Sequence, residues 1–140
     1  MSRLLKQDLF GTVTLVTLPG GGATVRRDTR AARWWLAWLA RHLARREAAA
    51  LRRLDGLAHV PRLVSSEGGT VVREWIDGAP MQLARPQDAR YFREALRLVR
   101  RLHARDIVHN DLAKEPNWLV TPDGLPALVD FQLAMHAPRR

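Results

Sequence analysis

Residues 107–131 read IVHNDLAKEPNWLVTPDGLPALVDF, the segment with the clearest structural pattern in the chain. Two short apolar runs, 118–120 and 127–129, flank a Thr-Pro-Asp-Gly sequence at 121–124. Apolar β-type residues on both sides of such a turn sequence are typical of a β-hairpin. A hairpin folds back on itself, so residues entering its first strand should lie close to residues leaving its second.

Polar residues gather at these two outer ends. His109, Asp111, Lys114 and Asn117 precede the hairpin, and Asp130 follows it. The fold-back therefore predicts a cluster of three oxygen-bearing side chains, Asp111, Asn117 and Asp130. An acid that orients a hydroxyl, with a carboxylate and an amide oxygen that hold hard cations, is what phosphoryl transfer from a magnesium nucleotide requires.

The same residues carry a resemblance to a known family. The His-x-Asp-Leu sequence at 109–112, Asn117 and the Asp-Phe pair at 130–131 resemble the catalytic loop and the metal-binding Asp-Phe-Gly of the protein kinase-like fold. The sequence looks most like small bacterial RIO-type and lipopolysaccharide-core (Kdo) kinase-like proteins. The order of the motifs, the hairpin between them and the asparagine make the signal fairly specific.

The resemblance implies an α+β fold, a minimal two-lobed kinase-like domain over residues 1–140. Residues 1–77 would form an N-lobe with a small antiparallel sheet and a long C-helix. Residues 78–140 would form a truncated helical C-lobe that carries the catalytic hairpin. ATP and Mg²⁺ are the implied cofactors.

The resemblance also assigns roles to the polar residues. Asp111 would accept or orient the proton of the attacking hydroxyl, and Lys114 would neutralise charge on the moving phosphoryl group. Asn117 and Asp130 would hold magnesium. His109 would brace the loop by hydrogen bonds.

The N-terminal part carries strand signals. Residues 12–18 and 23–25 flank a Pro-Gly-Gly-Gly turn and predict an antiparallel hairpin. In the kinase-like fold the third strand carries a phosphate-binding lysine, and Arg26 fits that place with arginine instead, with Arg27 as the alternative. The glycine-rich loop that covers the nucleotide in this fold is represented only by Gly11. A single glycine at this place is also consistent with an ordinary turn.

One long helix is expected from about Asp28, as N-cap, to Leu54, before Asp55-Gly56. Glu47 falls on its apolar stripe, where a carboxylate is costly unless it is paired. The resemblance implies that Arg26 is the ion-pair partner of Glu47. The alternative is that Glu47 lies at the edge of the apolar stripe and its carboxylate reaches water. The stripe consists of Ala32, Leu36, Leu39, Leu43, Ala50 and Leu54.

The opposite face of this helix places Trp34, Trp38, Arg41, Arg45 and Arg52 at helical spacing. Tryptophan interleaved with arginine suits peripheral contact with an anionic membrane, or a groove on another protein. The alternative is that the rest of the fold packs over the tryptophans.

Two more strands are predicted at 62–65 and 70–76, joined by a Glu-Gly-Gly turn. They resemble the last strand and hinge of the small kinase lobe. The resemblance makes Glu74, Trp75 and Ile76 candidates for adenine binding. A second helix is expected from about Pro86 to Arg105. Its predicted buried side comprises Tyr91 or Phe92, Ala95, Leu96, Val99, Leu102 and His103.

Composition narrows the classes of function. The chain has 140 residues, 46% of them hydrophobic and none of them cysteine, so we expect a packed core without disulfides or thiolate chemistry. We expect a cytoplasmic protein, because no signal peptide or membrane span is recognisable. Peripheral association with the inner membrane face is the alternative. The net charge of +9 favours an anionic partner or a solvated arginine-rich surface. No motif for specific nucleic-acid recognition is evident.

The sequence departs from the kinase pattern in several places. Asp111 and Asn117 are six positions apart, about one more than usual, and Pro116 is expected to set the resulting bulge. Gln132 replaces the glycine of Asp-Phe-Gly, and the peptide-binding elements of a kinase are not recognisable. The phosphate acceptor is therefore open between protein serine/threonine and a lipopolysaccharide-core sugar, and a nucleotide-binding pseudokinase is the alternative.

Overall fold

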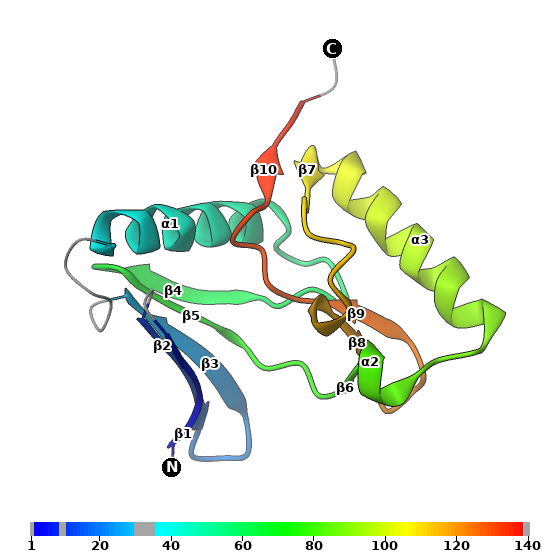
Figure 1. Cartoon of the computed structure of the whole chain (residues 1–140), viewed down its shortest axis with the longest axis horizontal. Coiled ribbons are helices and arrows are strands. Elements are labelled where there is room, and N and C mark those ends of the chain that lie inside the picture. The colour runs from blue at the N-terminus through cyan, green and yellow to red at the C-terminus, as the bar shows by residue number, and fades with distance from the viewer. Residues whose placement is uncertain (1, 9–10, 30–35, 139–140) are drawn as a thin grey trace.

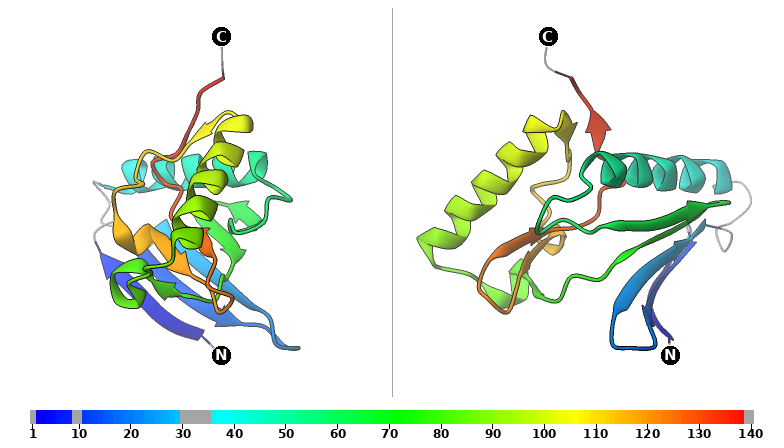
Figure 2. Two further views of the ribbon diagram at one scale, coloured as in Figure 1. Left: turned by 90° about the vertical axis from the view of Figure 1, so that its right-hand side faces the viewer. Right: turned by 180° about the vertical axis from the view of Figure 1, so that it is seen from behind.

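The computed structural model of the chain describes residues 2–8, 11–29 and 36–138 (Figure 1). Its N-terminal half is a five-stranded antiparallel sheet in the order β1-β2-β3-β5-β4, with one long helix, α1, lying along β4 (Figures 1 and 2). The bounds are β1 Ser2–Asp8, β2 Gly11–Thr17, β3 Ala23–Asp28, α1 Ala37–Arg53, β4 Leu63–Glu67 and β5 Thr70–Glu74.

The predicted β2–β3 hairpin is confirmed. Its turn closes with a hydrogen bond from the Leu18 amide to the Gly22 carbonyl, 2.7 Å long. Gly20 and Gly21 adopt φ of 100° and 98°, a left-handed conformation that explains why the turn uses glycine. The β4–β5 hairpin is also confirmed.

The predicted start of the long helix is wrong. Asp28 is the last residue of β3, where it pairs with Thr12 and Thr70, and α1 begins at Ala37. The β-ladder on both sides of β3 therefore outweighs the N-cap preference of the Asp28 side chain. Residues 30–35, which include Trp34, lie outside the described residues. The predicted end is confirmed, because α1 stops at Arg53 and Gly56 follows with φ of 82°.

The C-terminal half combines a helix with short strands. The bounds are β6 Ala79–Pro80, α2 Met81–Ala84, α3 Ala89–Ala104, β7 Ile107–Val108, a 3-10 helix η2 at Glu115–Asn117, β8 Trp118–Val120, β9 Pro126–Leu128 and β10 Met135–His136. Strand β8 pairs with β6 and β9, and β10 pairs with β7. The predicted β8–β9 hairpin is confirmed, with Trp118 opposite Leu128 and a turn closed by the Gly124 amide on the Thr121 carbonyl at 2.8 Å.

Helix α3 begins three residues after the predicted Pro86. Its N-cap is Asp88, whose side chain accepts a 2.9 Å hydrogen bond from the Arg90 amide. Tyr91, Leu98 and Leu102 are its buried residues. The predicted burial of Leu96 is wrong, and so is the alternative that placed Phe92 in the core, because the side chains of Leu96 and Phe92 are about half exposed. The core-facing side of the helix is centred on Tyr91.

One hydrophobic core joins the two halves. Leu51 of α1 and Leu54, the residue that caps its C-terminal end, pack in one cluster with α3 and Phe131. The α3 residues of this cluster are Leu98 and Leu102. The predicted α+β class is confirmed. In the described part of the chain, each helix is too short or too polar to cross a bilayer.

Candidate active site

The β8–β9 hairpin sets the geometry of the polar cluster. The Val129 amide donates a 2.9 Å hydrogen bond to the Asn117 carbonyl, so the residue before Asp130 is tied to the residue that enters β8. This confirms that the hairpin brings its outer ends together.

Asn117 is also bonded directly to Asp111. Its Nδ2 atom donates to Oδ2 of Asp111 at 3.0 Å and to the Asp111 carbonyl at 3.1 Å, and Asn117 is only 4% exposed. The extra residue between them is absorbed by η2, whose middle residue is Pro116. With the nitrogen engaged by two oxygens, Oδ1 is the end of the amide left for a cation.

His109 braces the loop, as predicted. Its Nδ1 atom accepts a 3.2 Å hydrogen bond from the Asp111 amide, which places the proton on Nε2, and Nε2 donates to the Val129 carbonyl at 3.0 Å. The ring is 1% exposed and packs edge-on against Phe131, with centroids 4.8 Å apart. His109 therefore ties the loop of Asp111 to the strand that leads into Asp130.

Asp130 has an unusual backbone conformation. Its φ is 61°, in the left-handed region that few residues other than glycine adopt, although aspartate and asparagine tolerate it best. Its side chain is 32% exposed, and Oδ1 lies 4.0 Å from Nη2 of Arg27. Backbone strain of this kind collects at functional sites, where the surrounding structure holds it in place.

The predicted pair of Glu47 with Arg26 is wrong, because Arg27 occupies that place. Nε of Arg27 lies 3.5 Å from Oε2 of Glu47, whereas Arg26 is 44% exposed and lies 3.9 Å from Asp28. Successive strand residues point to opposite faces, and Arg27 shares the α1-facing side with Val25. The predicted alignment was one residue out of phase, which reverses the face of every side chain.

Glu47 has a second cationic partner, Arg73, which was not among the residues predicted from the sequence. Nε of Arg73 donates to Oε1 of Glu47 at 3.2 Å. Glu47 is 1% exposed, Arg27 15% and Arg73 12%, so three charged groups share a nearly dry environment. Strand alternation from Val71 would have placed Arg73 on this face.

Gln132 completes the surroundings of Arg27. With its amide oxygen turned towards the guanidinium, it accepts from Nη1 at 2.7 Å and from Nε at 3.2 Å. Arg27 therefore faces Glu47, Asp130 and Gln132, one group from α1 and two from the segment after β9. From the sequence alone, Gln132 is recognisable only as a replacement for the glycine of Asp-Phe-Gly.

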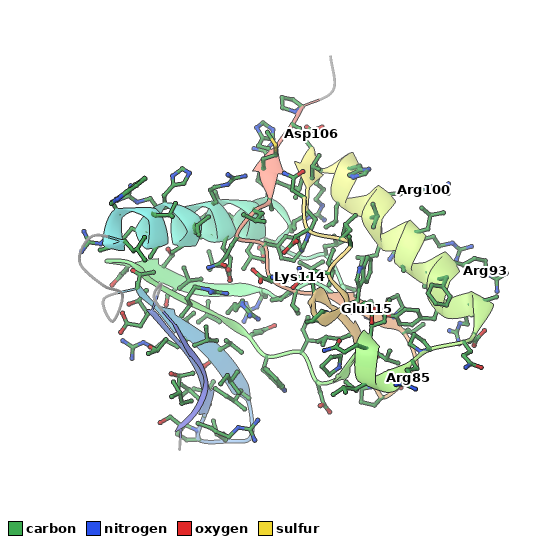
Figure 3. All side chains as sticks on the ribbon, in the orientation of Figure 1. Arg85, Arg93, Arg100, Asp106, Lys114 and Glu115 are labelled. Atoms are coloured by element: carbon green, nitrogen blue, oxygen red, sulfur yellow. The ribbon has the colours of Figure 1, made fainter. Side chains whose placement is uncertain are left out.

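The remaining predicted site residues lie around this cluster. Gly11 is the first residue of β2, next to positions 9–10, which are outside the described residues. Ile76 lies between β5 and β6, and neither its amide nor its carbonyl makes a hydrogen bond within the described part of the chain. Glu74 pairs with Arg62 at 2.8 Å, so its side chain is engaged elsewhere. Lys114 is exposed at the start of η2, beside Glu115 (Figure 3).

The oxygen ligands of this site fit magnesium only when substrate phosphates complete the coordination. Within the described residues no group of three or more His, Cys, Asp or Glu side chains is placed to hold a metal. Asp130 and the Asn117 amide oxygen supply one carboxylate and one neutral ligand. Magnesium is commonly bound by one or two carboxylates together with water and substrate phosphates, and this set matches that mode.

These features define a class of protein. An antiparallel sheet, a long helix with a buried glutamate paired to a strand cation, and a His-x-Asp loop before a hairpin that ends in aspartate form a minimal protein kinase-like fold. Residues 24–139 match the RIO domain family, and the chain belongs to it. It is similar to the EKC/KEOPS complex subunit BUD32 of Encephalitozoon cuniculi (strain GB-M1), with 39% identity over 72 residues. The match covers 49% of this chain and 36% of that relative, about a third of its length.

Proposed function

We propose that the protein is an ATP-dependent phosphotransferase that moves the γ-phosphoryl group of magnesium-ATP to a serine or threonine hydroxyl of a protein. The observation that carries the proposal is the bonded pair of Asp111 and Asn117, held by the hairpin beside Asp130. Membership of the RIO domain family supports the same chemistry.

The chain's own residues divide the work of the transfer. Asp111, fixed through its backbone and side chain by His109 and Asn117, would accept the proton of the attacking hydroxyl. Lys114, exposed at the mouth of the loop, would neutralise charge on the moving group. Asp130 and Asn117 would hold magnesium, which when bound supplies neutralisation of the phosphate oxygens.

Binding of the nucleotide would use the opposite wall. Arg27 points into the same space as Asp130 and would contact the phosphates in place of the usual lysine. Its planar fork matches phosphate oxygens in pairs. The free backbone groups of Ile76 would meet the adenine edge.

Thermal unfolding with and without magnesium-ATP tests the nucleotide site. A ligand at about one hundred times its dissociation constant adds roughly 2.7 kcal/mol to the free energy of unfolding. Asp130→Asn should remove most of that gain, and asparagine tolerates the left-handed backbone. Asp123→Asn, which changes the same charge in the exposed hairpin turn, should leave the gain intact. Equal responses of the two variants would refute a magnesium site at Asp130.

Transfer itself needs a separate readout. The protein is incubated with γ-labelled ATP and dephosphorylated casein, and the labelled amino acids are identified. Asp111→Asn should keep nucleotide binding while losing transfer by about a hundredfold or more. Label on serine and threonine in the unsubstituted protein supports the proposed acceptor, and its absence there contradicts it.

A second candidate is a nucleotide-binding protein without efficient transfer. The observation that favours it is the occupation of the cluster by Arg27, whose guanidinium lies 4.0 Å from Asp130 and bonds Gln132. A cation at that position offsets the charge that would attract magnesium. Stabilisation by ATP that needs no magnesium, together with no labelled product, would select this candidate.

A further inference from the structure

A groove of about 500 Å³ lies between α1 and the β4–β5 turn, and its lining includes none of the active-site residues described above. Its floor contains Ala44, Ala48 and Val71, each at most 2% exposed. Because the floor residues are small, the helix and the turn leave a hollow above them. Residues 66–69 form one wall, and three arginines of α1 form the other: Arg41, Arg45 and Arg52.

The groove carries unbalanced positive charge. The three arginines are exposed, and none makes an ion pair with the described residues of the chain. Glu67 is the one carboxylate in the lining, so three guanidinium groups minus one carboxylate leave a charge of +2. Cations gathered in a hollow without counter-charges attract an anionic ligand.

The groove borders an open sheet edge. The order β1-β2-β3-β5-β4 puts β4 at the end of the sheet, and among the described residues no strand pairs with its outer side. Figures 1 and 2 show α1 running along β4, so a chain laid beside β4 also passes the arginines of α1. An open edge offers backbone amides and carbonyls that an extended peptide can pair with.

We propose that this groove binds an acidic segment of a partner protein in an extended conformation. Its main chain would pair with β4, and its carboxylates would meet Arg41, Arg45 and Arg52. Arg45 lies four positions after Arg41 in α1, about 6 Å along the helix axis. Two residues of an extended strand span about 6.6 Å, so acidic side chains at alternate positions match this spacing.

A peptide explains the groove better than a membrane or a nucleic acid. The arginines line a hollow, which a flat bilayer surface cannot enter, and the 70% exposed Trp38 is not part of the lining. A nucleic acid would satisfy the arginines, but it has no peptide backbone to pair with the β4 edge. The inference does not depend on the proposed phosphotransferase activity.

The test is fluorescence anisotropy with a labelled peptide of about ten residues that alternates aspartate and threonine, long enough to span the three arginines. The control peptide has asparagine for aspartate. The groove variant combines Arg41→Gln, Arg45→Gln and Arg52→Gln. Its matched control combines Arg93→Gln, Arg100→Gln and Arg101→Gln on α3, which removes the same charge from exposed sites. Arg93 and Arg100 are labelled in Figure 3.

We expect the groove variant to bind the acidic peptide at least tenfold more weakly, equivalent to about 1.4 kcal/mol. The α3 variant should change binding by less than about twofold, because distant surface charges are screened by salt. Equal losses in both variants would show general charge attraction, and equal binding of the asparagine peptide would show that the carboxylates are not recognised. Either result overturns the proposal.

Two further arms separate the other ligands and the binding mode. Vesicles of phosphatidylcholine and phosphatidylserine, and an oligo-thymidine strand, are titrated against the same variants. A groove-dependent affinity for either that exceeds the affinity for the peptide overturns the assignment of the partner. Hydrogen exchange of the peptide complex should show new protection in β4, and unchanged exchange there would rule out strand pairing even if the peptide binds.

Discussion

Arg73 should be the most sensitive position near the site that touches neither nucleotide nor metal. The Glu47 carboxylate is 1% exposed and faces two guanidinium groups, at 3.2 Å from Arg73 and 3.5 Å from Arg27. Breaking a buried ion pair costs about 3–5 kcal/mol when the remaining charge has no partner. Because Arg27 stays in place, we expect Arg73→Met to cost about half of that, roughly 2 kcal/mol.

The cost is read from urea unfolding monitored by tryptophan fluorescence, with Arg62→Met as the control. Arg62 also pairs with a glutamate at 2.8 Å, but the side chains are 59% and 47% exposed, so its loss should stay within about 1 kcal/mol. If Arg73→Met costs no more than Arg62→Met, the two-cation account of Glu47 is wrong.

The same variant should weaken nucleotide binding. With Arg73 on Oε1, the Glu47 carboxylate remains compensated when Arg27 turns towards a phosphate. Without Arg73, Arg27 is the last partner of a buried charge, and phosphate must compete for it. We expect the ATP dissociation constant to rise about tenfold, equivalent to 1.4 kcal/mol, in isothermal titration. A loss of stability without any change in ATP affinity would show that Arg73 only supports the fold.

Two further predictions concern the framework. Burial raises the pKa of Tyr91 from 10.0 to about 12, so its contribution to stability should be present below pH 10 and lost as pH rises through 12. Tyr91→Phe should flatten that alkaline decline in pH-dependent urea midpoints. Gly69→Ala should destabilise the protein more than Gly124→Ala, because both residues have positive φ but only a Cβ on Gly69 would meet Oγ1 of Thr29. Equal thermal midpoints of the two glycine variants would contradict this.

Local sequence was enough to predict the hairpin and the cluster beside it. A turn sequence fixes which residues oppose each other over a few positions, and the polar residues next to the strands follow from that pairing. The contact between Asp111 and Asn117 therefore needed little information from the rest of the chain.

The phase of β3 could not be predicted in the same way. Arg26 and Arg27 are adjacent, and either can face the helix until something else fixes the strand. In the structure the choice is made by Val25 and Val71, which are 2% and 1% exposed on the α1-facing side of the sheet. The contact that decides the phase joins residues far apart in sequence. The prediction of the buried side of α3 was partly wrong for the same reason. Apolar residues occupy two adjacent stripes of that helix, and only tertiary contacts determine which stripe faces the core.

The site tolerates an unusual spacing because backbone atoms hold much of it. His109 bonds the Asp111 amide and the Val129 carbonyl, and the Val129 amide bonds the Asn117 carbonyl. These contacts join the loop to the strand before Asp130 without using the carboxylates of Asp111 or Asp130. An extra residue between Asp111 and Asn117 can therefore be taken up in η2 while the ends stay in place. Because these contacts do not involve the two carboxylates, the imidazole of His109, rather than the acids, should govern how rigidly the loop is held against the strand before Asp130.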